Sequence, residues 1–262
     1  MNNIHPTAFI GKDVIIGNNI TILPYTIIDG KIEIGDGCVI GPFSHIKGWV
    51  KIGSKTQIHS FSTIGDDPQD YSFDGTPGLI EIGQNCLIRE GVTIHTPVHG
   101  DQGEKTAIGN NVFLMVNSHV GHNAKVGDNS ILVNGTLLAG YVTVEDNVVT
   151  SGNVAIHQFC RVGSFVMIGG LSKVVQDIPP FVIADGDPAI VHGINAVGLK
   201  RKGFGQEERT IIKNAYKLLY SGKARSEALE EMLKEYPDNK HVLRIVEFVK
   251  ASKRGIIGYH EE

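Results

Sequence analysis

The chain has 262 residues, 41% of them hydrophobic and 32 of them glycine, and is therefore long enough to bury a large core. Its formal net charge of −4 argues against a general nucleic-acid binder, which needs a basic surface to neutralise phosphates. No apolar run approaches the roughly 18 residues of a membrane-spanning helix, so we expect no stable membrane insertion.

Charge is unevenly distributed along the chain. Residues 1–199 hold 10 Lys and Arg against 18 Asp and Glu, whereas residues 200–262 hold 14 against 10. The basic C-terminal part favours an anionic partner, although a solvated helical surface explains it equally well. The N-terminal sequence MNNIHPTAFIG predicts no signal peptide. The three cysteines are odd in number and far apart, which indicates no disulfide framework and fits a cytoplasmic protein.

Isoleucine occupies every sixth position from residue 4 to residue 64, eleven times in succession. The pattern resumes with aliphatic residues at 82–94 and at 108–174, where only Thr150 departs from it. A helix has a period of 3.6 and a single strand a period of 2, so neither produces a strict six. Such hexads predict a parallel β-helix, in which three short strands close a triangular coil and the sixth-position side chains stack inside.

Two segments interrupt the hexads. Residues 66–79 (DDPQDYSFDGTPGL) and 95–106 (HTPVHGDQGEKT) are rich in Gly, Pro and Asp, which predicts loops that leave the coil. Loops on a rigid scaffold often carry function, but both segments are equally well explained as simple decoration.

The hexads end at Val174, and Pro179-Pro180 marks a break. We therefore predict a β-helix over residues 1–178 and a helical domain over residues 179–262. Within the second part, residues 206–253 contain apolar stripes at helical spacing, which are typical of packing faces.

The segment NSHVGH, residues 117–122, places two histidines among small side chains. Since three hexads make one coil, residues 18 apart stack on strands about 4.8 Å apart. Gly140 therefore lies one coil above His122, and Gln158 lies two coils above it. His122 is off the inward position, so we expect it on the outer wall of the coil.

This column of residues suits acyl transfer. An imidazole can take the proton of an attacking hydroxyl or amine, and a glycine N–H can be approached closely by a developing oxyanion. Two other interpretations remain open. Histidines at a subunit boundary could bind zinc, as in a β-helix hydratase. Alternatively, His95, His119, His122 and His157 could be ordinary residues of a catalytically silent repeat scaffold.

Several segments resemble the acyl-[acyl-carrier-protein]–UDP-N-acetylglucosamine O-acyltransferase family of lipid A biosynthesis, a branch of the hexapeptide-repeat acyltransferases. The resemblance covers nearly the whole chain, and its most specific parts are IHQFC, QD-PP and GLKRKGF. The resembling segments are IGDDPQDYSFDG (64–75), IREGVTIH (88–95), NSHVGH (117–122), LLAGYVTV (137–144), AIHQFCRVG (155–163), VVQDIPPFVIADGDPA (174–189) and GLKRKGFGQEERTIIKNAYKLLY (198–220).

The resemblance implies an all-β left-handed parallel β-helix with a C-terminal α-helical domain. It also implies a homotrimer with active sites in clefts between subunits. The implied reaction transfers a 3-hydroxyacyl chain from acyl carrier protein to the 3-position of UDP-N-acetylglucosamine, the first step of lipid A biosynthesis. Neither a metal nor a cofactor is implied, because the phosphopantetheine thioester of the carrier protein is itself a substrate.

Matching the family's motifs assigns roles to individual residues. His122 is expected to be the general base, and the Gly140 N–H the oxyanion donor. The remaining matches are Gln69 and Asp70 for sugar contact, His95, His119, Tyr141, His157 and Gln158 for the substrate cleft, Asn195, Arg201 and Lys202 for the nucleotide side, and Gly170 for the limit on acyl length.

The chain departs from the family's usual residues at three positions. Asn123 replaces an aspartate after the expected base, Tyr141 replaces a histidine, and a lysine usual near Ser72 is missing. The absence of a side chain at Gly170, the position matched to the limit on acyl length, predicts a long acyl chain, although an ordinary corner glycine explains this residue equally well. The closest rival activity is N-acylation of a 3-amino UDP-sugar on the same scaffold, which NSHVGH does not distinguish. The basic C-terminal part would suit an acidic carrier protein.

Overall fold

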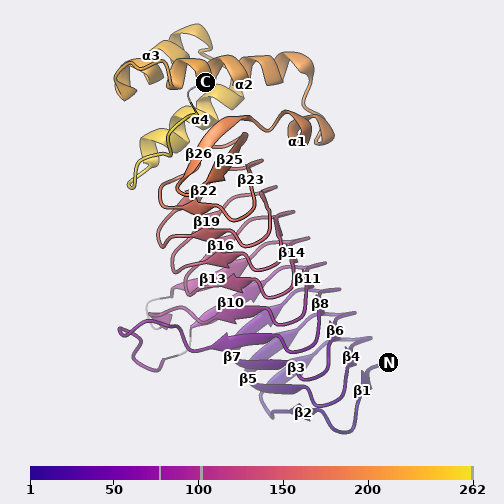
Figure 1. Cartoon of the computed structure of the whole chain (residues 1–262). Helices are drawn as coiled ribbons and strands as arrows, with labels where there is room; N and C mark the ends of the chain where they lie inside the picture. Colours follow the sequence, from indigo (N-terminus) through magenta and orange to yellow (C-terminus); the bar gives the residue numbers. More distant parts are fainter. Residues whose placement is uncertain (77, 101–102, 261–262) are drawn as a thin grey trace.

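The computed structural model describes residues 1–76, 78–100 and 103–260. They form a left-handed parallel β-helix with a small group of α-helices at its C-terminal end (Figure 1). The coil axis runs from the N-terminus to the helices, so position along the chain corresponds to height along the coil. The fold class predicted from the hexads and the resemblance is confirmed.

The first face of the coil, face 1, consists of parallel strands and ends in an antiparallel hairpin formed by its last two strands. Its strands in the described residues are β1 (Asn3–Ile4), β4 (Thr21–Ile22), β6 (Val39–Ile40), β8 (Gln57–Ile58), β11 (Leu87–Ile88), β14 (Phe113–Leu114), β17 (Ile131–Leu132), β20 (Val149–Thr150), β23 (Met167–Ile168), β25 (Val182–Gly186) and β26 (Ala189–Ile194).

The other two faces share the long strands β5 (Ile27–Ile34) and β7 (His45–Ile52), which continue around a corner. Face 2 adds β2 (Phe9–Ile10), β9 (Thr63–Asp66), β12 (Thr93–His95), β15 (His119–Val120), β18 (Leu137–Leu138), β21 (Ala155–Ile156) and β24 (Lys173–Val174). Face 3 adds β3 (Val14–Ile16), β10 (Leu79–Ile82), β13 (Lys105–Ile108), β16 (Lys125–Val126), β19 (Thr143–Val144) and β22 (Arg161–Val162).

The core is the stack of sixth-position side chains. Ile28, Ile46 and Ile64 are fully buried one above another on face 2, as the hexads predict. β-Branched side chains suit this stack because they lose little rotamer freedom on a pleated surface. Ile4 is 40% exposed because it lies at the open N-terminal end of the coil.

Tight corners join the faces, and one residue of most corners has a positive φ. Asparagine is common there, as at Asn129 (φ 58°) and Asn147 (φ 59°), because its short polar side chain tolerates the left-handed region. The corner between faces 2 and 3 repeats this geometry at Asn123, Tyr141 and Phe159.

Both insertions leave the coil at this same corner, between β9 and β10 and between β12 and β13. Partners across face 3 are 30 residues apart at Ile52 and Ile82, and 26 apart at Ile82 and Ile108, yet the stacking register is kept. The loop bases are joined, because the Gly78 N–H donates to Thr96 Oγ1 over 3.0 Å. The loops therefore begin directly below the corner that carries His122.

The C-terminal part contains α1 (Ala196–Arg201), α2 (Gln206–Leu219), α3 (Arg225–Glu235) and α4 (Lys240–Ala251). All four helices fall within residues 179–262, the range predicted to be helical, although the apolar stripes indicated only the last three. The β25–β26 hairpin lies in the same range and was not predicted, and its first strand continues face 1. None of the helices in the described ranges is long and apolar enough to cross a membrane.

Candidate active site

His122 lies at the corner between faces 2 and 3, above the two loops, and only 8% of its surface is exposed. Its imidazole packs directly on the backbone of Gly140 in the next coil. A Cβ atom built on Gly140 would come within 2.3 Å of both Nε2 and Cε1 of the ring. The glycine is therefore required for the ring to occupy this position.

The two ring nitrogens of His122 have different surroundings. Nδ1 is hydrogen-bonded to Asn123 Oδ1 at 2.9 Å. Nε2 lies 3.7 Å from Asp70 Oδ2 of the first loop, beyond ordinary hydrogen-bond distance. The Gly140 N–H has no hydrogen-bond acceptor within the described ranges, whereas the Tyr141 N–H donates to the His122 carbonyl over 2.9 Å. A proton acceptor and a free backbone donor thus lie side by side.

His95 and His119 form a second pair of imidazoles, on face 2. Their ring centroids are 4.8 Å apart in an edge-to-face arrangement, and Thr93 Oγ1 is hydrogen-bonded to His119 Nδ1 at 2.7 Å. Burial, together with the nearby His95 and His122, lowers the pKa of His119 to about 4. Burial also lowers the pKa of His95. Both rings are therefore neutral at pH 7 and serve as hydrogen-bonding groups rather than cations.

The lowered pKa of His119 predicts a specific loss of stability in acid. Between pH 6.5 and about pH 4 the unfolded chain binds more protons at this residue than the folded chain, so the free energy of unfolding falls as the pH falls through that window. In His119→Gln we expect the fall between pH 7 and pH 4.5, measured by urea denaturation, to be smaller by about 1 kcal/mol. A matched His157→Gln variant serves as control; equal slopes for wild type and His119→Gln would contradict the prediction.

A groove of ≈ 670 Å³ opens beside these histidines along face 2. The strand register aligns its outward-facing residues in one column, which rises from His119 through Leu137 and Ala155 to Lys173. His157 and Gln69 also line the groove. The middle of the column is apolar and its lower end carries the histidines, so the groove suits a ligand with a polar head and a hydrocarbon chain.

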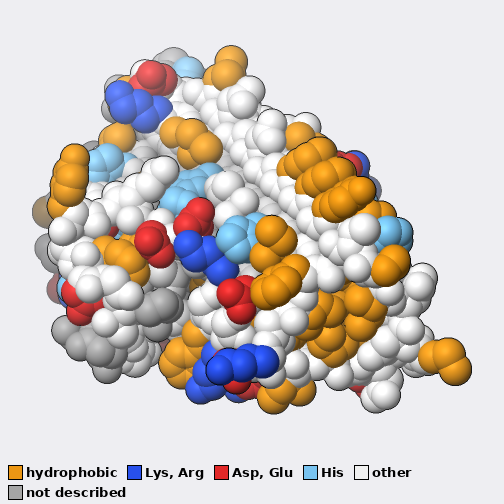
Figure 2. Space-filling model, turned by 90° about the horizontal axis from the view of Figure 1, so that it is seen from below, with side chains coloured by type: hydrophobic (Ala, Val, Ile, Leu, Met, Phe, Trp, Pro, Cys, Tyr) orange, Lys and Arg blue, Asp and Glu red, His pale blue; other side chains and the backbone are white. Residues whose placement is uncertain are grey.

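Seen from below, several histidine side chains lie close together with acidic side chains beside them (Figure 2). The structure brings together most of the site residues expected on the coil, namely Gln69, Asp70, His95, His119, His122, Gly140, Tyr141 and His157. Gln158 continues the column above Gly140 and is exposed. In the described ranges no group of three or more His, Cys, Asp or Glu side chains is arranged to hold a metal ion.

Four expected residues lie elsewhere in the same chain. Asn195 caps α1, because its Oδ1 accepts from the Gly198 N–H and its Nδ2 donates to the Phe165 carbonyl. Arg201 lines a separate cavity of ≈ 520 Å³ near the start of the helices, and Lys202 is exposed at the end of α1. Gly170 is exposed and does not line the groove beside His119.

The sequence pattern missed several residues of the site. Thr93, Leu137 and Ala155 belong to the His119 column, and counting 18 residues upward from His119 would have found the last two. Glu104 contacts Asn123 and Tyr141 from the second loop. No periodic signal could have found it, because loop residues follow no repeat.

Two family models match the chain. Residues 177–257 match the second domain of UDP N-acetylglucosamine O-acyltransferase, and residues 31–66 and 105–140 match the bacterial transferase hexapeptide of six repeats. Both matches agree with the observed division into a repeat coil and a different C-terminal part.

Full-length relatives extend this result. The acyl-[acyl-carrier-protein]–UDP-N-acetylglucosamine O-acyltransferase of Aliarcobacter butzleri is 47% identical over 257 residues, which cover 98% of each chain. The enzyme of the same name from Thiobacillus denitrificans is 44% identical and covers 98% of this chain and 100% of its own.

Solved structures agree with these matches. The crystal structure of a UDP-N-acetylglucosamine acyltransferase from Bacteroides fragilis superposes with a TM-score of 0.93 at 41% identity, covering 97% of this chain and 99% of its own. The Arabidopsis enzyme superposes with a TM-score of 0.88 at 32% identity, covering 98% of each chain. The chain is therefore an acyltransferase and belongs to the acyl-[acyl-carrier-protein]–UDP-N-acetylglucosamine O-acyltransferase family.

Proposed function

We propose that this protein transfers a 3-hydroxyacyl chain from acyl carrier protein to the 3-hydroxyl of UDP-N-acetylglucosamine, as the first step of lipid A biosynthesis. The names of its relatives support the substrates. The observation that carries the proposed mechanism is the contact between the His122 ring and the Gly140 backbone, where any Cβ would overlap Nε2.

His122 acts as the general base. Its Nε2 faces the open side of the corner, near Asp70, and takes the proton of the sugar hydroxyl as the oxygen attacks the thioester carbonyl. Asp70 and Gln69 reach this position from the first loop and orient the sugar through hydrogen bonds to its hydroxyl and amide groups.

Gly140 stabilises the charge that develops in this step. Attack converts the thioester carbonyl into a tetrahedral intermediate whose oxyanion accepts a hydrogen bond from the free Gly140 N–H. When the intermediate collapses, the carbon–sulfur bond breaks and the imidazolium returns its proton to the leaving thiolate of the carrier. An ester and a free phosphopantetheine thiol result, and the enzyme regains its starting state.

The groove along face 2 accommodates the acyl chain. Three strand spacings separate His119 from Lys173, a rise of about 14 Å along the coil. Leu137 and Ala155 lie between them and offer apolar contact to a hydrocarbon chain. No cofactor is needed, since the thioester supplies the activated acyl group.

Gly170 provides a test of acyl-chain length. A Cβ at this position would meet only ordinary contacts, the Gly152 carbonyl at 3.6 Å and the Ser151 Cβ at 3.7 Å, so Gly170→Met should fold normally. If the end of the acyl chain passes this corner, we expect kcat/KM for carriers of long acyl chains to fall at least about tenfold while shorter acyl chains become preferred. A chain-length series of carrier thioesters measures this, with Gly258→Met as control; an unchanged preference would contradict the role.

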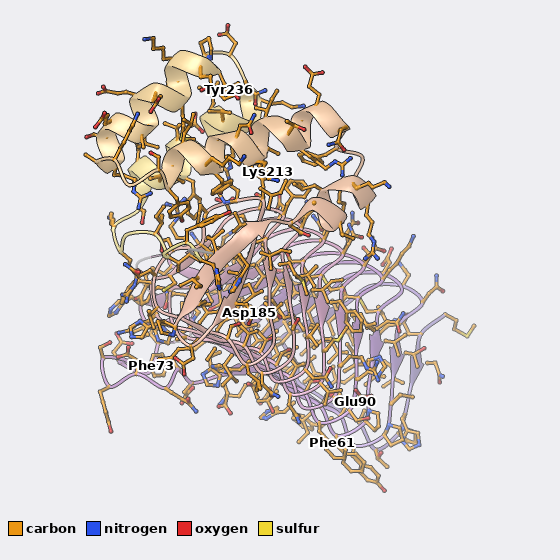
Figure 3. The ribbon with its side chains drawn as sticks, turned by 45° about the horizontal axis from the view of Figure 1, so that its top comes forward. Phe61, Phe73, Glu90, Asp185, Lys213 and Tyr236 are labelled. Carbon is orange, nitrogen blue, oxygen red and sulfur yellow. The ribbon has the colours of Figure 1, made fainter. Side chains whose placement is uncertain are left out.

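The nucleotide and the carrier protein would contact the C-terminal part. Lys200, Arg201 and Arg209 line one cavity there, and Lys213 lines a second of ≈ 460 Å³. Figure 3 shows Lys213 on the helical part, above the coil. Cations suit both a diphosphate and an acidic carrier. Arg201 does not line the His119 groove of its own chain, which accords with a homotrimer in which neighbouring subunits complete each site.

One assay tests the proposal as a whole. The purified protein is incubated with a 3-hydroxyacyl carrier thioester and either UDP-N-acetylglucosamine or its 3-amino analogue, and the product is identified by mass spectrometry. An O-acylated sugar nucleotide supports the proposal, whereas exclusive amide formation supports the N-acyltransferase alternative. Loss of activity with a chelator would instead support a zinc enzyme.

A cytoplasmic location accords with the free thiols of Cys38, Cys86 and Cys160.

A further inference from the structure

Asn123 follows His122 in sequence and is 94% buried, since only 6% of it is exposed. Its side-chain oxygen is hydrogen-bonded to His122 Nδ1 at 2.9 Å and accepts a second bond from the Val98 N–H at 3.1 Å. Its side-chain amide nitrogen donates to Glu104 Oε2. Both ends of the amide are therefore occupied by groups of the second loop.

These partners decide which way the amide faces. The Val98 N–H can only donate, so it requires the oxygen of Asn123 on its side. The ionised Glu104 carboxylate can only accept, so it requires the NH₂ group on the other side. In the reversed orientation a donor would face the Val98 N–H and an oxygen would face the carboxylate, leaving buried groups unpaired.

The orientation of Asn123 determines the state of His122. Because the oxygen of Asn123 faces Nδ1, the neutral imidazole must carry its hydrogen on Nδ1, and the lone pair of Nε2 then faces Asp70 and Gly140. A free amide could pair with either tautomer, since it offers both a donor and an acceptor. The aspartate usual in the family offers acceptor oxygens in either orientation, so it needs no partner to fix its orientation.

We propose that Glu104 is a positioning residue for catalysis: it orients the Asn123 amide so that His122 holds its proton on Nδ1 and presents Nε2 as the base. This inference rests on the proposed role of His122. The Tyr141 hydroxyl points at the same carboxylate oxygen from 3.4 Å, and the Tyr141 ring lies edge-on to the imidazole at 5.3 Å. Burial and the Glu104 charge raise the pKa of Tyr141, so its hydroxyl remains a donor.

Exchanging the two partners tests the inference. In wild type the Asn123 amide donates to the Glu104 carboxylate. In Asn123→Asp alone two carboxylates face each other at this place, so we expect kcat to fall at least about tenfold. In the double variant Glu104→Gln/Asn123→Asp, the amide introduced in the second loop donates to a carboxylate that still accepts from Val98 and His122. We expect its kcat to recover to within about threefold of wild type.

The pH profile gives a readout that a merely structural role would not change. The double variant Glu104→Gln/Asn123→Asp keeps the total charge but moves the negative charge from residue 104 to residue 123. There it is in contact with the imidazole and stabilises the imidazolium. The acid limb of kcat/KM should therefore move about one unit to higher pH. The other groups facing the ring are the same in both proteins: Asp70, Tyr141, His95 and His119.

Glu104→Met removes the acceptor and keeps the length of the side chain. We expect about a tenfold lower kcat with an unchanged KM, whereas Glu81→Gln, which alters the Lys105 ion pair on face 3, should match wild type.

The inference is overturned if Glu104→Met and Asn123→Asp both keep wild-type kcat, or if the double variant is no more active than Asn123→Asp. If His122→Ala is inactive in the same assays, only the inference about Glu104 is overturned and the proposed function stands. An active His122→Ala would overturn the proposed function itself.

Discussion

Replacing His122 with alanine is expected to lower kcat by about 10²–10⁴, with little change in KM for either substrate. The substitution removes the proposed base but leaves the Gly140 N–H, the face 2 groove and both loops in place. Because the ring lies against a glycine, alanine also leaves a space of imidazole size at the corner. Added free imidazole should therefore restore part of the activity, which is measured as thiol release from the acyl carrier.

His5→Ala is the matched control, since His5 is hydrogen-bonded to Thr7 in the first coil, far below the site. It should keep wild-type kcat. The thermal midpoints of both variants should stay close to that of wild type, which separates chemistry from folding. A His122→Ala protein that retained full activity would remove the proposed base and support the silent-scaffold interpretation.

Replacing Gly140 with alanine is expected to lower kcat by about 10²–10³ although it adds a single methyl group. The new Cβ would overlap Nε2 and Cε1 of His122, so the ring must rotate away from the Gly140 N–H, the proposed oxyanion donor. The protein should still fold, because the nearest atoms belong to that one side chain rather than to backbone. Steady-state kinetics together with circular dichroism measure both outcomes.

Gly152 provides a control at the same position of another corner, immediately before the positive-φ residue Asn153. A Cβ there meets only the Asn134 carbonyl at 3.6 Å, an ordinary contact. Gly152→Ala should therefore keep wild-type activity and stability. If both alanine variants lost activity equally, the effect would come from corner geometry in general and not from the contact with His122.

The repeat made most of the coil predictable. A strict period of six determines which side chain points inward, so the stacking of Ile28, Ile46 and Ile64 follows from counting. The same counting correctly placed Gly140 one coil above His122. It did not predict the burial of His122, because that depends on loops whose residues have no period.

Elements without a repeat were less predictable. The β25–β26 hairpin and the short helix α1 follow the last hexad, and their sequences carry no sustained alternation or helical stripe. The contact of Glu104 with Asn123 joins residues 19 apart through an irregular loop, so no spacing rule indicates it. Resemblance supplied the expected roles of Asn195 and Arg201, whereas the structure shows Asn195 also capping α1.

The shared corner of the two insertions has a consequence for how this enzyme can diversify. Since the coil regains its register after each insertion, a longer or shorter segment at that corner leaves every other strand where it was. We therefore expect the first insertion to vary in sequence while His122 and Gly140, which lie on the coil itself, keep their positions. Exchanging residues 67–78 between homologues should transplant sugar selectivity without disturbing the histidine and glycine above it.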